Sequence, residues 1–298
     1  MYFDTAGGPV FRPPSEAESF ILRVTIGCSH NRCTYCNMYR SVNFRTRTMD
    51  EIMEQINHAK QYKDFIRRIF LADGNALVLS TDILLEILKL LRESFPKLRR
   101  VSCYAGPNDI LRKTPEELQD LSKAGLKLVY YGMESGDDEV LRHVNKGVTA
   151  QQSIEAGQKV VAAGIKLSLM VIIGLGGKVG SRQHAYHTAQ AVNAIRPTML
   201  SALTLMMYRG SELRAEFERG EFEILSPVEI MGELYELIHG IDLPIESHCL
   251  FRSNHISNYV ALAGTLPQDK EKLLADSQKA IGHLSTMTEW DPYNNVEQ

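Results

Sequence analysis

Apolar runs of strand length alternate with longer amphipathic segments along most of this 298-residue chain. Short runs rich in β-branched and aromatic residues are typical of buried strands, and longer segments with apolar residues three and four apart are typical of helices. Six strands are predicted, over residues 20–26, 68–72, 100–105, 126–133, 166–174 and 199–207. Strands that alternate with helices in this way form a parallel sheet through right-handed crossovers, either open and doubly wound or closed as a barrel.

Helix start patterns lie between the predicted strands. In a capping box, a hydroxyl and a carboxylate or amide three residues later satisfy the backbone N–H groups at the start of a helix. Proline at the first helical position loses no hydrogen bond there. The capping pairs are Thr48 with Glu51, Thr114 with Glu117 and Thr149 with Gln152, and the prolines that follow a hydroxyl residue are Pro115 and Pro227.

The two ends of the chain differ from the middle. Residues 1–18 are rich in glycine and proline and are expected to form an extended leader without helix or strand. From residue 211 to 298 we expect a C-terminal extension with two short helices, a strand near 245–251, a helix after Pro267 and a loosely held tail from about residue 285. The predicted domains are therefore 1–18, 19–210 and 211–298.

Composition indicates an ordinary globular protein of the cytoplasm. The net charge is −3, and lysine and arginine are spread along the chain rather than gathered in blocks. A large nucleic-acid surface needs concentrated positive charge, so it is disfavoured. The first residues do not resemble a signal peptide, and there is no uninterrupted apolar stretch long enough to span a membrane. Five cysteines, three of them crowded together, fit a reducing compartment better than a disulfide framework.

Three cysteines follow the first predicted strand within nine residues: Cys28, Cys33 and Cys36. Three thiolates on one loop can bind three irons of a [4Fe-4S] cluster and leave the fourth iron open to a substrate or cofactor. With His30 they could instead form a structural Cys3His zinc site. The choice between the two depends on the rest of the chain.

Glycines and small polar residues follow several of the other strands. Asp73, Gly74 and Asn75 follow the second strand, Glu134 and Ser135 the fourth, and a glycine-rich stretch begins at Gly174 after the fifth. The carboxyl ends of parallel strands meet on one rim, where α/β barrels carry their chemistry. Asp73 and Asn75 could also be plain turn residues. A structural zinc ion needs no such rim, so an iron–sulfur cluster is favoured.

These motifs together resemble the radical S-adenosylmethionine (SAM) superfamily over about residues 19–210. The usual Cys-x3-Cys-x2-Cys loop has an aromatic residue before its last cysteine; here Tyr35 is that aromatic residue, and one extra residue lies between Cys28 and Cys33. The segment 131–147 resembles its counterpart in the subgroup of oxygen-independent coproporphyrinogen oxidase, the methylthiotransferases and the elongator catalytic subunit. The resemblance implies a partial (β/α)6 TIM-like barrel with a C-terminal extension.

The resemblance also implies roles for individual residues. Cys28, Cys33 and Cys36 would bind the [4Fe-4S] cluster. SAM would be contacted at its adenine by Tyr35, Ile172 and Gly174, at its methionine end by Asp73, Gly74 and Asn75, and at its ribose or carboxylate by Glu134 and Ser135.

The activity implied is reductive cleavage of SAM to a 5′-deoxyadenosyl radical that removes hydrogen from a substrate, with flavodoxin or ferredoxin as electron donor. Lacking a basic block, the chain is expected to act on a small organic molecule, with tRNA modification as the alternative. A non-catalytic iron–sulfur or zinc protein, serving as carrier or scaffold, is the alternative of another class.

Several other residues are candidates of lower rank. Cys103 and Cys249 could have redox roles but are more typical of buried hydrophobic positions. Arg252, Asn254 and His255 could face the substrate, although a structural loop is the default interpretation. The loop 174–181 does not fit a phosphate-binding P-loop. His184 and His187 stand one helical turn apart and could bind a metal, but a solvated helix face is favoured.

Overall fold

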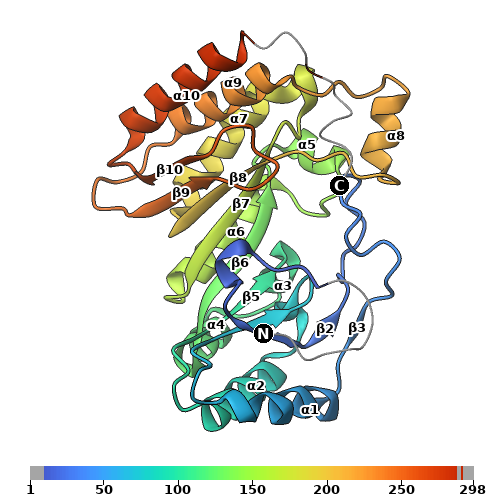
Figure 1. Cartoon of the computed structure of the whole chain (residues 1–298), viewed down its shortest axis with the longest axis vertical. Helices are drawn as coiled ribbons and strands as arrows, with labels where there is room; N and C mark the ends of the chain where they lie inside the picture. The colour runs from blue at the N-terminus through green and yellow to red at the C-terminus, as the bar shows by residue number, and fades with distance from the viewer. Residues whose placement is uncertain (1–9, 287–289, 291–298) are drawn as a thin grey trace. The chain divides into compact units, whose positions relative to one another are not determined.

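The protein has a mostly parallel eight-stranded sheet, seen in a computed structural model that describes residues 10–286 and residue 290. The strands are ordered β1-β4-β5-β6-β7-β8-β9-β10 (Figure 1). The pairs β1/β4, β4/β5, β5/β6, β7/β8 and β8/β9 are parallel, whereas β10 runs antiparallel to β9. The predicted α/β class is therefore confirmed. The strands of this sheet span Phe20–Arg23, Arg68–Ala72, Arg100–Ala105, Leu126–Glu134, Lys166–Ile173, Met199–Thr204, Cys249–Ser253 and Leu262–Leu266.

The six predicted strands are confirmed with small shifts at their ends, except that the first one is divided. β1 ends at Arg23, and the chain continues as β2 (Thr25–Ile26), which pairs with β3 (Arg45–Thr46) in a separate two-stranded sheet. Between the two, Val24 donates its N–H to Ala72 and accepts from the N–H of Arg47. All residues from 20 to 26 are buried, so burial runs unbroken through both strands and the sequence pattern does not reveal the division.

The first of two compact units comprises Met1–Asn31, Tyr39–Tyr131 and Lys159–Leu167. It contains β1, β4, β5, most of β6 and a group of helices. Of the predicted capping boxes, those at Thr48 and Thr114 both form here. The helices of this unit are α1 (Met49–Ala59), η2 (Lys60–Tyr62), η3 (Ala76–Val78), α2 (Thr81–Ser94), α3 (Pro107–Leu111) and α4 (Pro115–Ala124).

The prediction that the leader contains no helix is wrong for one turn. Pro14–Glu16 forms a short 3-10 helix, η1. Its last residue, Glu16, is buried and accepts hydrogen bonds from Tyr130 Oη and Arg100 Nη2, each at 2.7 Å, and from Ser19 Oγ. These side chains hold the turn in place, which a glycine- and proline-rich composition does not reveal. Residues 1–9 of the predicted leader lie outside the described residues.

The second unit comprises Arg32–Met38, Gly132–Gln158 and Ser168–Gln298. It contains the end of β6, most of β7, and β8 to β10. Helix α9 packs between α7 and α10 (Figure 1). The boundary predicted at residue 210 falls inside this unit and stays a prediction. The helices here are α5 (Asp138–His143), most of α6 (Ala150–Ala162), α7 (Gly177–Ile195), α8 (Glu212–Glu218), α9 (Pro227–Gly240) and α10 (Lys270–Leu284).

The C-terminal part of the second unit is more regular than predicted. α9 extends over 14 residues and is not a short helix. The strand expected near 245–251 is β9, Cys249–Ser253, and β10 was not predicted. The helix expected after Pro267 is α10. Of the predicted tail from residue 285, all but residues 285, 286 and 290 lie outside the described residues.

The two faces of β7 differ in burial, and this difference orients the candidate site. Leu169, Val171 and Ile173 are buried, whereas Met170 and Ile172 on the opposite face are half-buried. Because successive side chains of a strand point to opposite faces, Ile172 lies on the more open face of the sheet.

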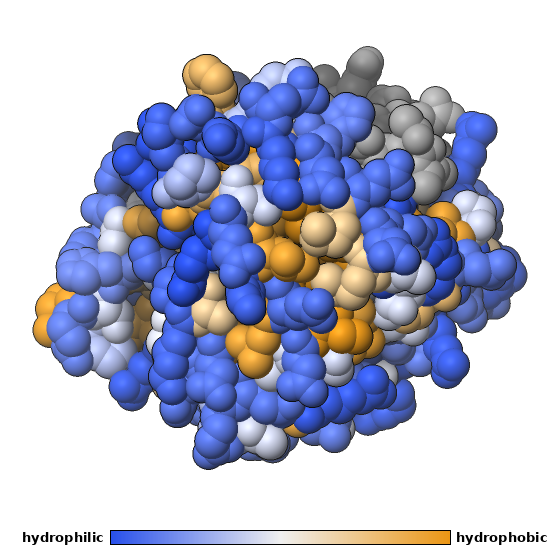
Figure 2. Space-filling model, turned by 90° about the horizontal axis from the view of Figure 1, so that it is seen from below, coloured by the Kyte–Doolittle hydropathy of each residue, from blue (hydrophilic) through white to orange (hydrophobic). Residues whose placement is uncertain are grey.

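On the outside, hydrophilic residues cover most of the face in Figure 2, with hydrophobic residues gathered near its middle. No helix of the described chain is long and apolar enough to cross a membrane.

Candidate functional site

In the first unit, Cys28 lies against the turn that follows β4. The Gly74 N–H donates to Gly27 O at 3.1 Å. A Cβ atom on Gly74 would lie 2.9 Å from Cys28 Cβ and 3.1 Å from the ring of Tyr39. Contacts that close exclude any side chain, so glycine is needed here for close packing rather than for an unusual φ. We name this group of residues, with Asp73 and Asn75, the Cys28 locus.

Asp73 in the Cys28 locus belongs to a buried ion pair and is more than a turn residue. Its Oδ2 accepts from Arg23 Nε at 2.7 Å and from the Gly27 N–H at 3.1 Å, and Arg23 Nη2 lies 2.6 Å away. Both side chains of the pair are fully buried. Burial raises the pKa of Asp73, and the hydrogen bond from Arg23 opposes that increase. The pair fixes the turn after β4 to β1.

Asn75 joins the same turn to the cysteine loop. Its Oδ1 accepts from the Ser29 N–H at 3.0 Å, and its Nδ2 donates to Ser29 Oγ at 2.5 Å and to Asp109 Oδ2 at 2.8 Å. Both ends of the amide are therefore engaged within the protein. Burial raises the pKa of Asp109, and the bond from Asn75 opposes this. Asn75 thus fixes the residue that follows Cys28.

Tyr39 also belongs to the Cys28 locus, because its ring lies against Gly74. Its hydroxyl is buried and has no hydrogen-bond partner among the described residues. Burial raises the pKa of Tyr39, and the nearby Asp73 adds to the increase. The unsatisfied hydroxyl is a candidate donor to a bound group, because buried polar groups without partners are rare.

In the second unit, the segment carrying Cys33 and Cys36 is anchored through its backbone. The Thr34 N–H donates to Val144 O at 3.0 Å, and Thr34 O accepts from the Leu213 N–H at 3.1 Å. Asn37 Nδ2 donates to Arg209 O at 2.7 Å. The segment is thereby fixed between the residues after α5 and the start of α8. Both cysteines are half-buried.

Tyr35, between these cysteines, contacts a predicted SAM-binding residue. Its ring packs against an apolar cluster that includes Val144 and Leu205. Its hydroxyl lies close enough to the Glu134 carboxylate for that negative charge to oppose its ionisation. Burial raises the pKa of Tyr35 well above its usual value, and the charges of Glu134 and the neighbouring cysteines add to the increase. The hydroxyl is therefore a hydrogen-bond donor at neutral pH.

Glu134 ends β6 in a constrained conformation. Its φ of +68° is in the left-handed region, which non-glycine residues adopt rarely and often at functional sites. Lys146 Nζ lies 3.0 Å from Glu134 Oε1, and both side chains are largely buried. A Cβ on Gly132 would lie only 2.2 Å from the same oxygen. Glu134 is therefore held by a lysine and by close packing against the bare backbone of a glycine, and the Tyr35 hydroxyl lies nearby. We name these residues, with Cys33 and Cys36, the Glu134 locus.

Beyond Glu134, the predicted residues of β6 and β7 are linked through helix α7. Ser135 Oγ is 2.8 Å from His184 Nδ1, and His184 Nε2 is 3.0 Å from Ile172 O. Gly174 has φ +87°, and its N–H donates to Glu233 Oε1 at 2.7 Å. His184 thus links Ser135 to Ile172 by hydrogen bonds, and Glu233, which binds Gly174, lies 3.6 Å from the same ring.

The solvated helix face expected for His184 and His187 is wrong for the first of them. His184 is only 1% exposed, and His187, 43% exposed, bonds to Asp137 Oδ2 at 2.6 Å. Burial acts to raise the pKa of Asp137, but its bonds from backbone N–H groups, Gln183 and His187 together lower it. Each histidine is engaged by the segment after β6, so their spacing serves packing rather than a shared metal ion.

The lower-ranked candidates are placed as follows. Cys103 and Cys249 are buried, and burial raises the pKa of each to about 12, so both are inert thiols near neutral pH. Arg252 Nη1 donates to the backbone oxygens of Phe251 and Gly264, which favours a structural role in the β9–β10 hairpin. His255 is bonded to Ser257, and burial lowers its pKa. Asn254 is exposed.

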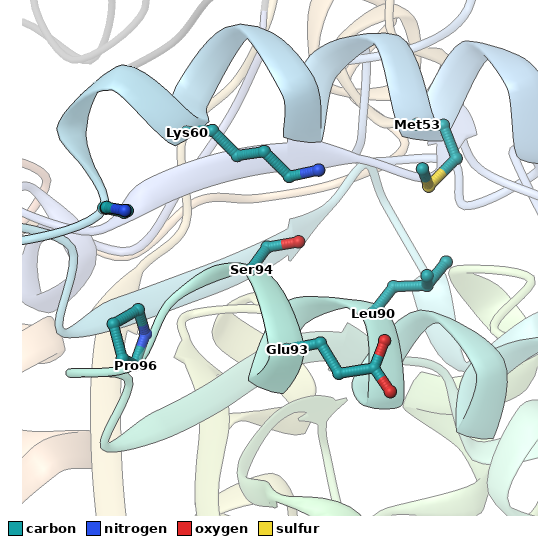
Figure 3. A pocket seen from close by; sticks show the side chains of 7 residues that line it. Met53, Lys60, Leu90, Glu93, Ser94 and Pro96 are labelled. Carbon is teal, nitrogen blue, oxygen red and sulfur yellow. The ribbon is translucent and has the colours of Figure 1, made fainter.

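Two further features bear on where ligands could bind. A cavity of about 470 Å³ lies between α1 and α2 of the first unit, but it includes none of the predicted site residues (Figure 3). It is lined by Met53, Lys60, Lys63, Leu90, Glu93, Ser94 and Pro96.

No three potential metal ligands of the histidine, cysteine, aspartate or glutamate type come together among the described residues. Cys28 belongs to the first unit, whereas Cys33 and Cys36 belong to the second.

The residues that bind the predicted site residues through ion pairs and hydrogen bonds were not predicted from the sequence. Arg23 is the lone charge in a buried apolar strand, and Glu233 occupies a position between Ile230 and Leu237 where the helix pattern calls for an apolar residue. A charge in such a place indicates a buried partner, because unpaired charges are not buried. Lys146 lay inside a segment singled out for its motif, but its partner could not be identified from spacing.

The chain was compared with known families and curated proteins. Residues 22–188 match the model of a family described as the radical SAM superfamily. A Methanocaldococcus jannaschii protein, provisionally named a methylthiotransferase, is 25% identical over 158 residues, a match that spans 49% of this chain and 33% of that protein. The chain therefore covers about a third of the length of this curated relative.

Three solved structures share the fold of this chain. Coproporphyrinogen III oxidase from Escherichia coli, described as a radical SAM enzyme, has a TM-score of 0.56 and 18% identity, covering 74% of this chain and 51% of that one. Elp3 of the archaeon Methanocaldococcus infernus has a TM-score of 0.53 and 15% identity, and the match covers 89% of this chain and 64% of that one. Methylornithine synthase has a TM-score of 0.53 and 14% identity, and the match covers 89% of this chain and 80% of that one. At these identities the likeness concerns the fold alone.

Proposed function

The chain belongs to the radical SAM superfamily, and from this premise we propose that it is an enzyme that binds a [4Fe-4S] cluster through Cys28, Cys33 and Cys36 and cleaves SAM. One observation carries the proposal. Each cysteine segment is anchored, within its own unit, beside a motif predicted to bind SAM: Cys28 beside the turn at Gly74, and Cys33 and Cys36 on either side of Tyr35, whose hydroxyl lies near the Glu134 carboxylate.

The donor set fits an iron–sulfur cluster. Thiolates are soft ligands that suit iron–sulfur clusters, and all three cysteines are half-buried, unlike the inert Cys103 and Cys249. The unsatisfied hydroxyl of Tyr39, close to Cys28, leaves a polar donor in the locus. These features support a bound group at the loop, and they favour a cluster over structural zinc.

The residues that would hold SAM follow from the two loci. The turn at Gly74 would receive the methionine end, with Asp73 and Asn75 holding that turn in place. Glu134 and Ser135 would contact the ribose or carboxylate. Tyr35 would contact the adenine, together with Ile172 on the more open face of β7 and the backbone of Gly174.

The protein supplies position rather than acid–base chemistry. When bound, the cluster would supply the electron that splits SAM into methionine and a 5′-deoxyadenosyl radical, and an external one-electron donor such as flavodoxin or ferredoxin would replace that electron. The chain's own residues orient SAM and exclude water from a reactive species. This division of work explains why the loci contain glycines, hydroxyls and held carboxylates.

A small organic molecule is the proposed substrate. The net charge is −3 and the lysines and arginines are scattered along the sequence, which disfavours the concentrated positive charge that tRNA binding needs. Asn254 and His255, in the loop after β9, are the proposed substrate-side residues. The alternatives are a tRNA-modifying radical SAM enzyme and a non-catalytic iron–sulfur or zinc carrier.

Anaerobic purification tests the proposal. Iron and sulfide analysis should give about four of each per chain, and dithionite with SAM should yield 5′-deoxyadenosine. The variant Cys33→Ala should lose both the cluster and this product, whereas the matched control Cys103→Ala should keep both, because Cys103 is buried away from any ligand role. Zinc in place of iron, or a reduced cluster that leaves SAM intact, would falsify the proposal. Salt-sensitive tRNA binding would instead select the tRNA alternative.

A further inference from the structure

One buried side chain, His184 on α7, joins two segments that are distant in sequence. Its Nδ1 is 2.8 Å from the hydroxyl of Ser135, just after β6, and its Nε2 is 3.0 Å from the carbonyl of Ile172, near the end of β7. The ring is 1% exposed. No water competes for these bonds, so the ring sets the distance between the two segments.

The hydrogen bonds place one hydrogen on this ring. A carbonyl oxygen can only accept, so Nε2 carries a hydrogen and donates it to Ile172 O. At Nδ1 the ring has two hydroxyl neighbours, Ser135 Oγ at 2.8 Å and Thr188 Oγ1 at 3.4 Å. Ser135 Oγ also accepts from the Asp137 N–H at 2.9 Å. Both ring nitrogens are therefore engaged within the protein.

Glu233 on α9 lies beside the His184 ring and binds the turn after β7. Its Oε1 accepts from the Gly174 N–H at 2.7 Å and lies 3.6 Å from His184 Nε2, and its Oε2 accepts from Ser181 Oγ at 2.5 Å. The Glu233 side chain is fully buried. Burying a carboxylate beside an imidazole is costly unless the bonds are well made, and apolar residues could fill the same space. A gain other than stability is therefore expected from this arrangement.

We propose that His184 and Glu233 are positioning residues for SAM: through Ser135 on one side and Ile172 and Gly174 on the other, they hold the proposed ribose and adenine contacts in one fixed arrangement. This inference rests on the proposed function. Neither residue touches SAM in this scheme. Their effect is on the affinity for SAM, because binding to a pre-arranged pair of segments avoids the entropy of ordering them.

The test compares three variants of the anaerobically reconstituted holoprotein. His184→Phe keeps the ring packing and removes both hydrogen bonds, His184→Gln keeps one donor and one acceptor, and His187→Phe is the matched control one turn along α7. The dissociation constant of SAM is measured by equilibrium dialysis. Cluster content and the electron paramagnetic resonance spectrum of the reduced cluster, with and without SAM, are recorded beside it.

His184→Phe should bind SAM about tenfold more weakly, a factor that corresponds to about 1.4 kcal/mol and to the loss of two net hydrogen bonds. His184→Gln should recover most of this affinity, and His187→Phe should bind like the wild type. Cluster content should be unchanged in all three. The rate of 5′-deoxyadenosine formation at saturating SAM should also be unchanged, so that KM rises while kcat does not.

Equal SAM affinity in His184→Phe and the wild type would overturn the inference, as would equal losses in His184→Phe and His187→Phe. If His184→Phe does not fold, Ser181→Ala decides instead: it removes one bond to Glu233 at the partly exposed end of the network, and unchanged SAM affinity there rejects the proposal. Failure of the wild type to bind SAM would defeat the proposed function itself. A wild type that binds SAM, with variants that bind it equally well, defeats only this inference.

Discussion

Replacing Arg23 by methionine is expected to destabilise the first unit strongly. Arg23 and Asp73 are both 0% exposed, and Arg23 contacts Asp73 Oδ2 through Nε at 2.7 Å and Nη2 at 2.6 Å. The other oxygen of Asp73, Oδ1, has no hydrogen-bond partner in the described chain. Without Arg23, the remaining donor to the carboxylate is the Gly27 N–H at 3.1 Å. Methionine fills a similar volume, so the change isolates the lost charge.

Removing one partner of a buried ion pair typically costs about 3–5 kcal/mol. With an unfolding entropy of about 2.1 cal/mol/K per residue over 298 residues, that loss lowers Tm by roughly 5–8 °C. Thermal unfolding followed by circular dichroism at pH 7.5 measures the shift. The matched control is Lys97→Met in the same unit, because the Lys97–Asp64 pair is about half exposed at 3.5 Å and should be worth at most about 1 kcal/mol.

The pH dependence separates lost charge from lost packing. Burial already raises the pKa of Asp73, and removing Arg23 raises it further. A carboxyl group with a raised pKa in the folded state stabilises the protein at low pH and loses that contribution as the pH rises through the folded pKa. The deficit of Arg23→Met should therefore shrink as the pH falls toward 5, and adding Asp73→Asn should restore part of it at pH 7.5. A loss below about 1 kcal/mol, or one that neither acidification nor Asp73→Asn relieves, would refute the reasoning.

Two further predictions concern Glu134 and Glu51. Gly132→Ala should reduce 5′-deoxyadenosine formation at least about tenfold, because the new Cβ would lie 2.2 Å from Glu134 Oε1; Gly180→Ala, with nothing within 4 Å of its Cβ, should leave the rate unchanged. The hydrogen bond from Arg45 and the Thr48 N–H lower the pKa of Glu51 from 4.5 to about 2, so its contribution to stability is present above pH 4.5 and fades as the pH falls toward 2. Urea unfolding between pH 6 and 3 should therefore show a smaller acid loss in Glu51→Gln than in the wild type.

Much of the fold could be predicted because its determinants are local. The capping bonds of Thr48, Thr114 and Thr149 join residues three positions apart, and all three form as predicted. The six main strands were found because each is a contiguous apolar run. β10 was missed because only Leu262 and Leu266 of its five residues are buried, and its pairing with β9 spans a long loop. The short β3 consists of two exposed residues and carries no apolar pattern.

By itself, the sequence determined the strand–helix alternation, the cysteine loop and the residues at the strand ends, because spacing along the chain fixes which residues share a strand end or a helix face. Only the tertiary structure decided what holds those residues. Arg23 meets Asp73 across 50 positions, His184 meets Ser135 across 49, and Glu233 meets Gly174 across 59. Hydrophobic patterning specifies which faces are buried, but it does not specify which buried polar groups meet. That choice depends on how the strands and helices pack, since each such group must find its partner within the fold.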